Sequence, residues 1–155
     1  MTPSATPPLT LGAPASLAEI EPLLRAVRLP TDDLGDVAPE DARVAVRDGR
    51  PVGCVALQPL GGPSASAHLL RSLAVAPEAR GEGIARRLVA AVEGLARERG
   101  AREIHLITTT AEPFFAALGY VSIARDDAPE AVRITRQFCG LCPGSAVVMR
   151  KEVGA

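Results

Sequence analysis

The sequence predicts an α/β fold with a mixed sheet. Segments of β-type pattern alternate with segments of helical period along the 155 residues. A continuous apolar run over residues 68–75, typical of a central strand covered on both faces, precedes the strongest amphipathic pattern of the chain, over residues 84–99. We therefore expect one domain over residues 9–155, after a flexible, Pro- and Thr-rich tail over residues 1–8.

Capping and turn signals place the elements of the first half of the chain. Ser16 and Glu19 have the spacing of a capping box, and the apolar residues behind them recur at helical period as far as Pro30. The dipeptide Asp48-Gly49 lies between two β-rich runs, which is a strong short-range signal of a hairpin. A helix and then a pair of antiparallel strands are therefore expected.

In the second half of the chain, glycines mark the ends of the helices. Gly100 follows the amphipathic segment, and Gly119 follows a shorter helical segment, each as a C-terminal stop. The strands expected in the whole chain are residues 9–11, 42–46, 52–57, 68–75, 103–109, 120–124 and 146–150. The expected helices are residues 17–28, 84–99 and 111–118, with helical spacing again within residues 128–140.

Composition excludes several classes of protein. The 17 Lys and Arg residues face 18 Asp and Glu residues, so the net charge is −1 and a dedicated nucleic-acid binder is not expected. No apolar run approaches the ~18 residues of a membrane-spanning helix, and the N-terminus lacks the pattern of a secretory signal. An odd count of 3 cysteines argues against a disulfide framework. The sequence thus predicts a cytoplasmic protein with no membrane partner.

The turn between the central strand and the amphipathic helix predicts an anion site. Gly81 and Gly83 lack side chains that would hold the backbone away from an anion, and Arg80 can offer a charge-assisted hydrogen bond. The free N–H groups at the helix start add the positive end of the helix dipole. The P-loop ending Gly-Lys-Ser/Thr is absent, and so is a G-x-G-x-x-G pattern. A pyrophosphate site and a plain glycine turn both fit these residues.

These residues also carry a resemblance to a known family. The pattern Arg80-x-x-Gly83-x-Ala85, preceded by Ser72-Leu73-Ala74-Val75, resembles the acetyl-coenzyme A signature of the GNAT N-acetyltransferase superfamily. Residues 46–53 resemble the second and third strands of that family, and residues 114–120 resemble the helix and strand that follow its coenzyme site. The likeness covers nearly the whole chain. It implies a mostly antiparallel sheet of six to seven strands, flanked by about four to five helices and splayed at the central strand.

Three further segments are similar to a narrower group. Residues 69–73, 106–110 and 141–146 resemble the N-acetyltransferases of bacterial arsenic-resistance operons. Neighbouring branches, which act on amino acids such as glutamate or on phosphinothricin-like compounds, share parts of these motifs. The resemblance implies acetyl transfer to the primary amine of a small molecule. The narrower likeness suggests that this molecule is an arsenic-containing or arsenic-linked amino compound. A homodimer is also expected, because dimers are common in the superfamily.

The resemblance assigns roles in binding acetyl-coenzyme A, the co-substrate. The backbone of Leu73 and Val75 would hold the pantetheine, and the N–H of Val75 would stabilise the tetrahedral oxyanion. The turn and the start of the helix would take the pyrophosphate. The cofactor-binding residues implied are Leu73, Ala74, Val75, Arg80, Gly81, Glu82, Gly83, Ile84, Ala85 and Phe114.

The general acid usual in this superfamily, a tyrosine on the short helix, has no match here. Phe114 and Phe115 stand at the matching place, and the single tyrosine, Tyr120, lies beyond Gly119, where a strand is expected. The loss of a general acid slows such a reaction about 10²–10⁴-fold without abolishing it. Ser145 or a bound water is left as a candidate in its place.

Candidate acceptor-binding residues lie near the ends of the predicted strands. Arg71 is a charged residue in an otherwise apolar strand, and three interpretations are open. It binds a carboxylate or another oxyanion of the substrate, or it forms an ion pair with an acidic residue such as Glu103. Alternatively, it lies at an edge of the sheet and is exposed to solvent. Thr108 and Thr109 are also candidates, although β-branched residues are common in strands for packing reasons alone. Arg133 and Arg136 are expected on a solvated helix face. The substrate-binding candidates are Arg71, Thr108, Thr109 and Ser145.

Cys139 and Cys142 form a C-x-x-C pair without further metal-ligand spacing, so no metal site is expected. Two thiols can bind a soft centre such as trivalent arsenic, although packing at a helix end is the simpler interpretation. Three rivals remain open beside a small-molecule N-acetyltransferase linked to arsenic. They are an amino-acid or antibiotic N-acetyltransferase, a protein acetyltransferase, and a coenzyme- or arsenical-binding module without turnover.

Overall fold

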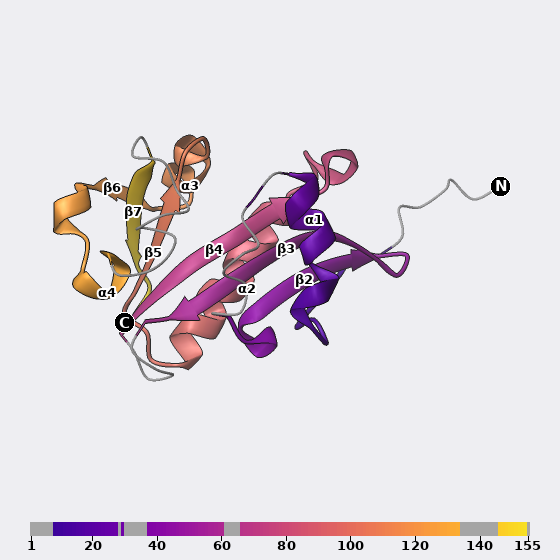
Figure 1. Cartoon of the computed structure of the whole chain (residues 1–155), viewed down its shortest axis with the longest axis horizontal. Helices are drawn as coiled ribbons and strands as arrows, with labels where there is room; N and C mark the ends of the chain where they lie inside the picture. The colour runs from indigo at the N-terminus through magenta and orange to yellow at the C-terminus, as the bar shows by residue number, and fades with distance from the viewer. Residues whose placement is uncertain (1–7, 28, 30–36, 61–65, 134–145, 155) are drawn as a thin grey trace. The chain divides into compact units, whose positions relative to one another are not determined.

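The computed structural model describes residues 8–27, 29, 37–60, 66–133 and 146–154. Its elements follow the order expected from the sequence (Figure 1). The strands are β1 (Thr10–Gly12), β2 (Ala42–Arg47), β3 (Arg50–Pro59), β4 (Ala67–Val75), β5 (Glu103–Thr108), β6 (Val121–Ile123) and β7 (Val147–Glu152). The α-helices are α1 (Glu21–Ala26), α2 (Ile84–Glu98), α3 (Glu112–Ala117) and α4 (Glu130–Arg133).

The strands form a seven-stranded sheet in the hydrogen-bonded order β1-β2-β3-β4-β5-β7-β6. The ladders of β1 with β2, β2 with β3, β5 with β7 and β6 with β7 are antiparallel. The ladder of β4 with β5 is parallel and pairs residues 67–69 with residues 103–105. This confirms the predicted α/β fold with a mixed, mostly antiparallel sheet.

Contacts divide the chain into two compact units. The first unit comprises Met1–Ala56 and Ser72–Val92, and the second comprises Leu57–Arg71 and Glu93–Ala155. The strands β3 and β4 and the helix α2 each contribute residues to both units. The end of β4 that pairs with β5 therefore belongs to the second unit, while its last four residues, 72–75, belong to the first.

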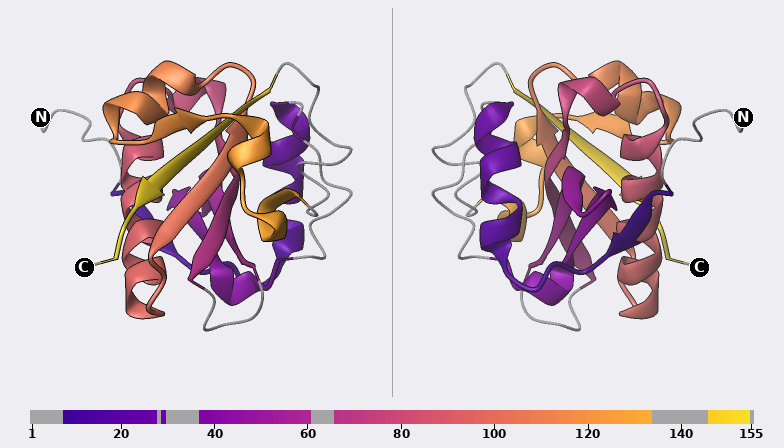
Figure 2. Two further views of the ribbon diagram at one scale, coloured as in Figure 1. Left: turned by 90° about the vertical axis from the view of Figure 1, so that its left-hand side faces the viewer. Right: turned by 90° about the vertical axis from the view of Figure 1, so that its right-hand side faces the viewer.

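In the first unit, α1 and the first half of α2 lie on opposite faces of the strands (Figure 2). One buried cluster there consists of Val37, Ala42 and Ala56, with Leu17 packed against it. The β2–β3 turn has positive φ at both Asp48 (54°) and Gly49 (71°), as a two-residue hairpin turn of the primed type requires. The hairpin predicted from this dipeptide is therefore confirmed.

The expected single helix over residues 17–28 is wrong in detail. A 3-10 turn at Leu17–Glu19 comes first, and the helix α1 begins only at Glu21. Ser16 caps the 3-10 turn by accepting a hydrogen bond of 3.2 Å from the N–H of Ala18. The break follows from Pro22, which has no N–H to continue a helix from the preceding turn but is well suited to the first turn of a new one.

The second unit has a separate buried cluster between its strands and the segment around α4. Its members are Leu60, Ala67, Leu69, Ala128, Val132 and Val148, with Ile107 and Ile123 packed against them. The strand expected at residues 120–124 is β6, Val121–Ile123. Within the helical pattern expected over residues 128–140, the structure has α4 at Glu130–Arg133. Residues 134–145 lie outside the described part of the chain, as do residues 1–7 of the expected tail.

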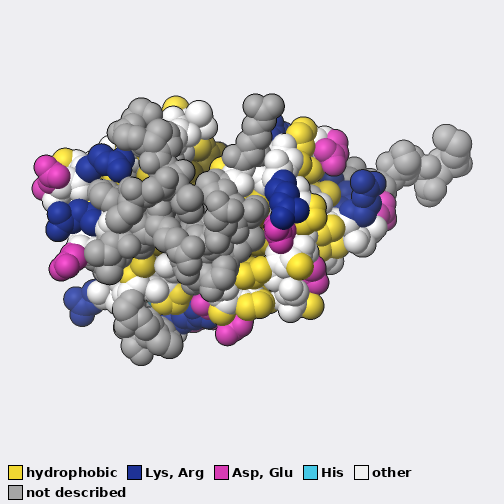
Figure 3. Space-filling model, viewed as in Figure 1, with side chains coloured by type: hydrophobic (Ala, Val, Ile, Leu, Met, Phe, Trp, Pro, Cys, Tyr) yellow, Lys and Arg dark blue, Asp and Glu magenta, His cyan; other side chains and the backbone are white. Residues whose placement is uncertain are grey.

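The surface carries charges of both signs. On the face drawn in Figure 3, side chains of Lys and Arg alternate with those of Asp and Glu. None of the helices in the described residues has the length and apolar character needed to cross a membrane.

Candidate active site

The strand β4 has a backbone irregularity at Ser72. Its φ of 58° lies in the left-handed region, which residues other than glycine rarely adopt. Residues 67–71 of the strand are all buried, whereas Ser72 and Leu73 are both half-buried, so the burial pattern of the strand changes at this point. Such a change re-aims the backbone groups of the residues that follow, as a bulge does.

The side chain of Cys54 on β3 forms a hydrogen bond with the backbone at this irregularity. Its thiol donates a hydrogen bond of 3.3 Å to the carbonyl oxygen of Ser72. Burial raises the pKa of the Cys54 thiol to about 12, an effect larger than the opposing hydrogen bond with the backbone of Ala74. The thiol therefore stays protonated near neutral pH and remains a donor to Ser72.

The neighbouring residues of β3 position the end of β4 and the start of α2. The N–H of Ala76 donates a hydrogen bond of 2.8 Å to the carbonyl of Val52. A Cβ atom at Gly53 would lie 2.9 Å from Cγ2 of Ile84 and 3.0 Å from Cδ1 of Leu88. The first turns of α2 thus approach β3 so closely that a Cβ atom at residue 53 would force the Ile84 or Leu88 side chain to shift.

A tight turn joins β4 to α2. After a 3-10 turn at Pro77–Ala79, Gly81 and Gly83 have φ values of 82° and 80°. These values favour glycine, because an L side chain is strained there. A Cβ atom at either glycine would meet no described atom within 4 Å, so the backbone path and not packing requires glycine. The turn therefore leaves open space on the side where side chains of residues 81 and 83 would lie.

The start of α2 adds hydrogen-bond donors to this turn. The first helical bond runs from the N–H of Arg87 to the carbonyl of Gly83, at 3.1 Å. The N–H groups of Ile84, Ala85 and Arg86 precede it and have no acceptor within the helix. With the positive end of the helix dipole, they form the kind of site that binds a phosphate group.

Arg80 lies at the same turn and is exposed. Its Nε donates a hydrogen bond of 3.3 Å to the carbonyl of Val75, which keeps the guanidinium beside the end of β4. The other guanidinium N–H groups can form charge-assisted bonds to a phosphate. The residues predicted to bind the coenzyme between Leu73 and Ala85 thus all lie in the first unit.

Sequence reasoning missed one charged neighbour of this turn. The carboxylate of Glu82 pairs with Arg47 at the end of β2, with 2.9 Å between Nη2 and Oε1. The family resemblance implies that the backbone N–H of Glu82 binds the coenzyme, whereas the Glu82 side chain pairs with Arg47. The available signal was a charged residue at the end of a strand, next to the hairpin turn.

Arg71 is buried in the second unit, with 3% of its surface exposed, so the reading of an edge position in solvent is wrong. Its Nη1 donates a hydrogen bond of 3.0 Å to Oε1 of Gln58 on β3. The carboxylate of Glu103, the other partner considered, lies 3.7 Å from Arg150 and 3.8 Å from His105. A side-chain amide thus holds the guanidinium in place.

The acceptor candidates Thr108 and Thr109 lie at the end of β5 and just after it, and the coenzyme candidate Phe114 lies on α3. Oγ1 of Thr108 accepts a hydrogen bond of 3.0 Å from the N–H of Ala111, at the start of α3, while Thr109 is exposed. Phe114 is half-buried and packs edge-to-face on Phe115, with 5.1 Å between ring centroids. All three candidates lie in the second unit.

Several candidates cannot be placed. Ser145 lies outside the described residues, as do Arg136, Cys139 and Cys142, while Arg133 is exposed at the end of α4. In the part of the chain that the structure describes, no three or more His, Cys, Asp or Glu side chains gather in a group able to hold a metal ion.

Tyr120 is not on the short helix. That helix, α3, ends at Ala117 and carries Phe114 and Phe115, as expected from the sequence. Tyr120 is buried just before β6, and its hydroxyl donates a hydrogen bond of 2.9 Å to Oε2 of Glu93. Burial, together with the Glu93 charge, raises the pKa of Tyr120 far above its usual range. This hydroxyl is therefore a structural donor rather than an acid poised near neutral pH.

Comparison with known proteins gives the family. Residues 39–122 match the acetyltransferase (GNAT) domain model, so the chain belongs to the GNAT acetyltransferase domain family. An amino-acid acetyltransferase of Ralstonia nicotianae is 30% identical over 126 residues, which are 75% of this chain and 27% of that relative. The chain thus spans about a quarter of the length of this curated relative.

Solved structures show the same fold. N-acetylglutamate synthase from Neisseria gonorrhoeae, complexed with coenzyme A and N-acetyl-glutamate, matches with a TM-score of 0.74 and 21% identity, over 94% of this chain and 35% of that one. Rv2747 from Mycobacterium tuberculosis, in complex with CoA, matches with a TM-score of 0.75 and 23% identity, over 94% of this chain and 99% of that one.

Proposed function

We propose that this chain is an N-acetyltransferase, which uses acetyl-coenzyme A as co-substrate and acetylates the primary amine of a small molecule. The observation that carries the proposal is the turn from Arg80 to Ala85. It combines an exposed guanidinium, two glycines of positive φ and the unpaired N–H groups at the start of α2. The complexes of structural neighbours with coenzyme A support the same co-substrate.

The proposed binding mode uses backbone groups on both sides of this turn. Main-chain groups of Leu73 and Val75 would hold the pantetheine, because the irregularity at Ser72 re-aims this part of β4. The N–H of Val75 would donate to the thioester oxygen as it becomes an oxyanion. The turn and Arg80 would bind the diphosphate.

The proposed reaction is direct transfer to a neutral amine. The amine nitrogen attacks the thioester carbonyl carbon, a C–N bond forms, and the C–S bond breaks to release the coenzyme as its thiolate. A thiol of pKa ~8.5 is an acceptable leaving group near neutral pH, so the absence of a tyrosine on α3 is compatible with turnover. Ser145 or water would carry the proton between the amine and the departing sulfur.

We propose that the acceptor carries a carboxylate or another oxyanion. The buried guanidinium of Arg71, fixed by Gln58, supports this class of acceptor, because buried arginines are suited to bidentate binding of such groups. The names of the relatives, an amino-acid acetyltransferase and N-acetylglutamate synthase, point the same way. Amino acids are therefore the first candidates. Arsenic-containing amino compounds, suggested by the motifs at residues 69–73, 106–110 and 141–146, are the second.

The test measures release of free thiol from acetyl-coenzyme A against a panel of amines. The panel contains glutamate, phosphinothricin, its arsenical analogue, an aminophenyl arsenical and a lysine peptide. We expect rapid release with one of the small amines and little with the peptide. If none of the amines gives thiol release although the coenzyme still binds, the chain is a binding module instead. No binding of the coenzyme would refute the assignment of the turn.

Substitution of Arg71 tests the acceptor class. Arg71→Lys keeps the charge but not the fork of donors, and Arg71→Met removes both. We expect KM for the acceptor to rise in both variants, more in the second, with KM for acetyl-coenzyme A unchanged. Arg25→Met, at an exposed position on α1, is the matched control. An equal rise in both KM values would mean that Arg71 serves the fold and not the acceptor.

A further inference from the structure

Glu82 places a negative charge within the turn that is proposed to bind the diphosphate. It lies between Gly81 and Gly83, and successive Cα atoms are about 3.8 Å apart. Its carboxylate is thus within about 10 Å of an anion bound at those N–H groups, a distance near the Debye length at physiological ionic strength. Screening at this range is incomplete, so Glu82 on its own would weaken binding of the coenzyme.

Arg47 is placed to cancel this charge. Its Nη2 lies 2.9 Å from Oε1 of Glu82, and its side chain is 19% exposed against 38% for Glu82. The Nε of Arg47 is buried and has no hydrogen-bond partner among the described residues. A guanidinium that is largely removed from water requires a counter-charge, and Glu82 supplies it.

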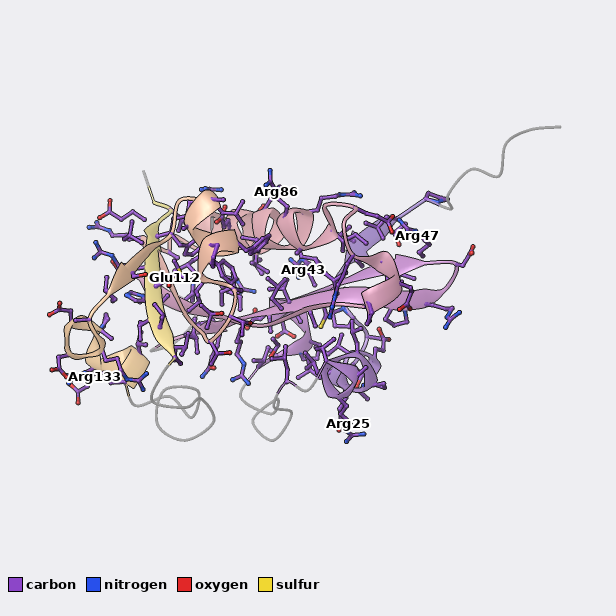
Figure 4. All side chains as sticks on the ribbon, turned by 90° about the horizontal axis from the view of Figure 1, so that it is seen from above. Arg25, Arg43, Arg47, Arg86, Glu112 and Arg133 are labelled. Carbon is purple, nitrogen blue, oxygen red and sulfur yellow. The ribbon has the colours of Figure 1, made fainter. Side chains whose placement is uncertain are left out.

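The pair connects the turn to the β2–β3 hairpin of the first unit. Arg47 is the last residue of β2 and is paired in register with Arg50 across the hairpin turn. In Figure 4, the labelled Arg47 lies beyond the end of α2 that the turn leads into. Pairing with Arg50 fixes the backbone position of Arg47, and from there its side chain reaches Glu82.

We propose that Arg47 is a positioning residue of the coenzyme site: by neutralising Glu82 and holding its side chain, it makes the turn able to accept the diphosphate. The inference rests on the proposed function. It assigns Arg47 an action through Glu82, not a contact with the coenzyme. Its consequence is that Arg47 matters for coenzyme affinity only while residue 82 is an acid.

A double-mutant cycle separates this role from direct contact. The variants are Arg47→Met, Glu82→Gln and the double variant, where glutamine retains an acceptor oxygen for Arg47. Arg50→Met, an exposed arginine on the same hairpin, is the matched control. Affinity for coenzyme A is measured by titration calorimetry, KM and kcat for acetyl-coenzyme A by thiol release, and folding by thermal melting.

We expect Kd and KM for the coenzyme to rise in Arg47→Met and to recover in the double variant. Arg47→Met raises Kd and KM for the coenzyme about three- to ten-fold, with a smaller change in kcat, because one full charge beside the diphosphate becomes uncompensated. The double variant returns to within about two-fold of the unmodified protein, because no charge is left to neutralise. The rise in Arg47→Met shrinks at 0.5 M salt, which a purely structural role would not produce. Arg50→Met changes neither constant.

Other outcomes overturn the inference. If the double variant binds as weakly as Arg47→Met, Arg47 contacts the coenzyme directly. If the rise disappears with dephospho-coenzyme A, Arg47 acts at the 3′-phosphate instead. Unchanged Kd and KM in Arg47→Met, with coenzyme bound normally by the unmodified protein, would refute this inference alone. Absence of binding by the unmodified protein would refute the proposed function and, with it, the role of Arg47.

Discussion

The hydroxyl of Tyr120 and the carboxylate of Glu93 form a buried hydrogen bond of 2.9 Å between the residue before β6 and the middle of α2. The same carboxylate oxygen accepts a bond of 3.0 Å from Nζ of Lys151 on β7, and this ammonium lies 5.5 Å from the centroid of the Tyr120 ring. Three elements of the second unit thus meet at one carboxylate. The arrangement explains why the single tyrosine of the chain is unsuited to proton transfer during catalysis.

Tyr120→Phe is expected to destabilise the fold without changing the rate of acetyl transfer. Loss of a hydrogen bond to a charged group costs about 1.5–3 kcal/mol, and the free energy of unfolding should fall by about this amount in denaturant titrations. The value of kcat for acetyl transfer should change little. Ser122→Ala, which removes an exposed hydroxyl bonded to Glu112, is the control and should change stability by less than about 0.5 kcal/mol. A kcat lower by more than about ten-fold in folded Tyr120→Phe would assign it a role as general acid.

Gly53→Ala is expected to damage both stability and coenzyme binding. The added Cβ would lie 2.9 Å from Cγ2 of Ile84, so either this side chain or the first turn of α2 must shift, and we expect the helix to move. Overpacking of this kind costs about 1–3 kcal/mol, and the Kd for coenzyme A should rise because the N–H groups at the start of α2 move with the helix. Thermal melting and calorimetric titration measure the two effects.

The control for this variant lies on α2 itself. A Cβ at Gly94 would meet nothing within 4 Å, so Gly94→Ala should stabilise the protein by about 0.5–1 kcal/mol through helix propensity. Coenzyme affinity should be unaffected. If Gly53→Ala proves as harmless as Gly94→Ala, the close approach of α2 to β3 does not constrain the site.

His105 is expected to make the protein less stable in mild acid. Its side chain is fully buried on β5, and this burial lowers its pKa below 6.5, against the smaller opposing effect of Glu103, with Arg150 also lowering it. The unfolded chain therefore binds a proton at pH values where the folded protein does not. The contribution is complete above about pH 6.5 and is lost as the pH falls below it, at up to about 1.4 kcal/mol per pH unit.

The measurement compares unfolding free energies between pH 7.5 and pH 5 for the unmodified protein and for His105→Gln, which does not titrate. The variant is expected to be less stable at pH 7.5 but to lose less stability on acidification. The difference between the two slopes isolates His105 from the carboxylates, which contribute to both. Equal slopes would show that His105 keeps its ordinary pKa in the folded protein.

Local backbone chemistry explains why much of the fold could be predicted. The hairpin at Asp48-Gly49 and the turn through Gly81 and Gly83 depend on residues that adopt positive φ at low cost, and these are visible in the sequence. The amphipathic period over residues 84–99 likewise reports which face of a helix is buried. The error at α1 had a local cause as well, since Pro22 marks the start of a new helix.

The side-chain partners could not be predicted in this way. Tyr120 and Glu93 are 27 residues apart, and Lys151 and Glu93 are 58 apart, so their meeting depends on how α2, β6 and β7 pack. The ion pair of Arg47 with Glu82 and the support of Ser72 by Cys54 arise in the same way, from strands and a turn that are distant in sequence. Periodicity and turn propensity act over a few residues, which is why the order of the elements and the glycine turn before α2 can be read from the sequence. Whether Glu82 is neutralised by Arg47, and whether the Tyr120 hydroxyl is buried, follows only from strand register and close packing in the folded chain.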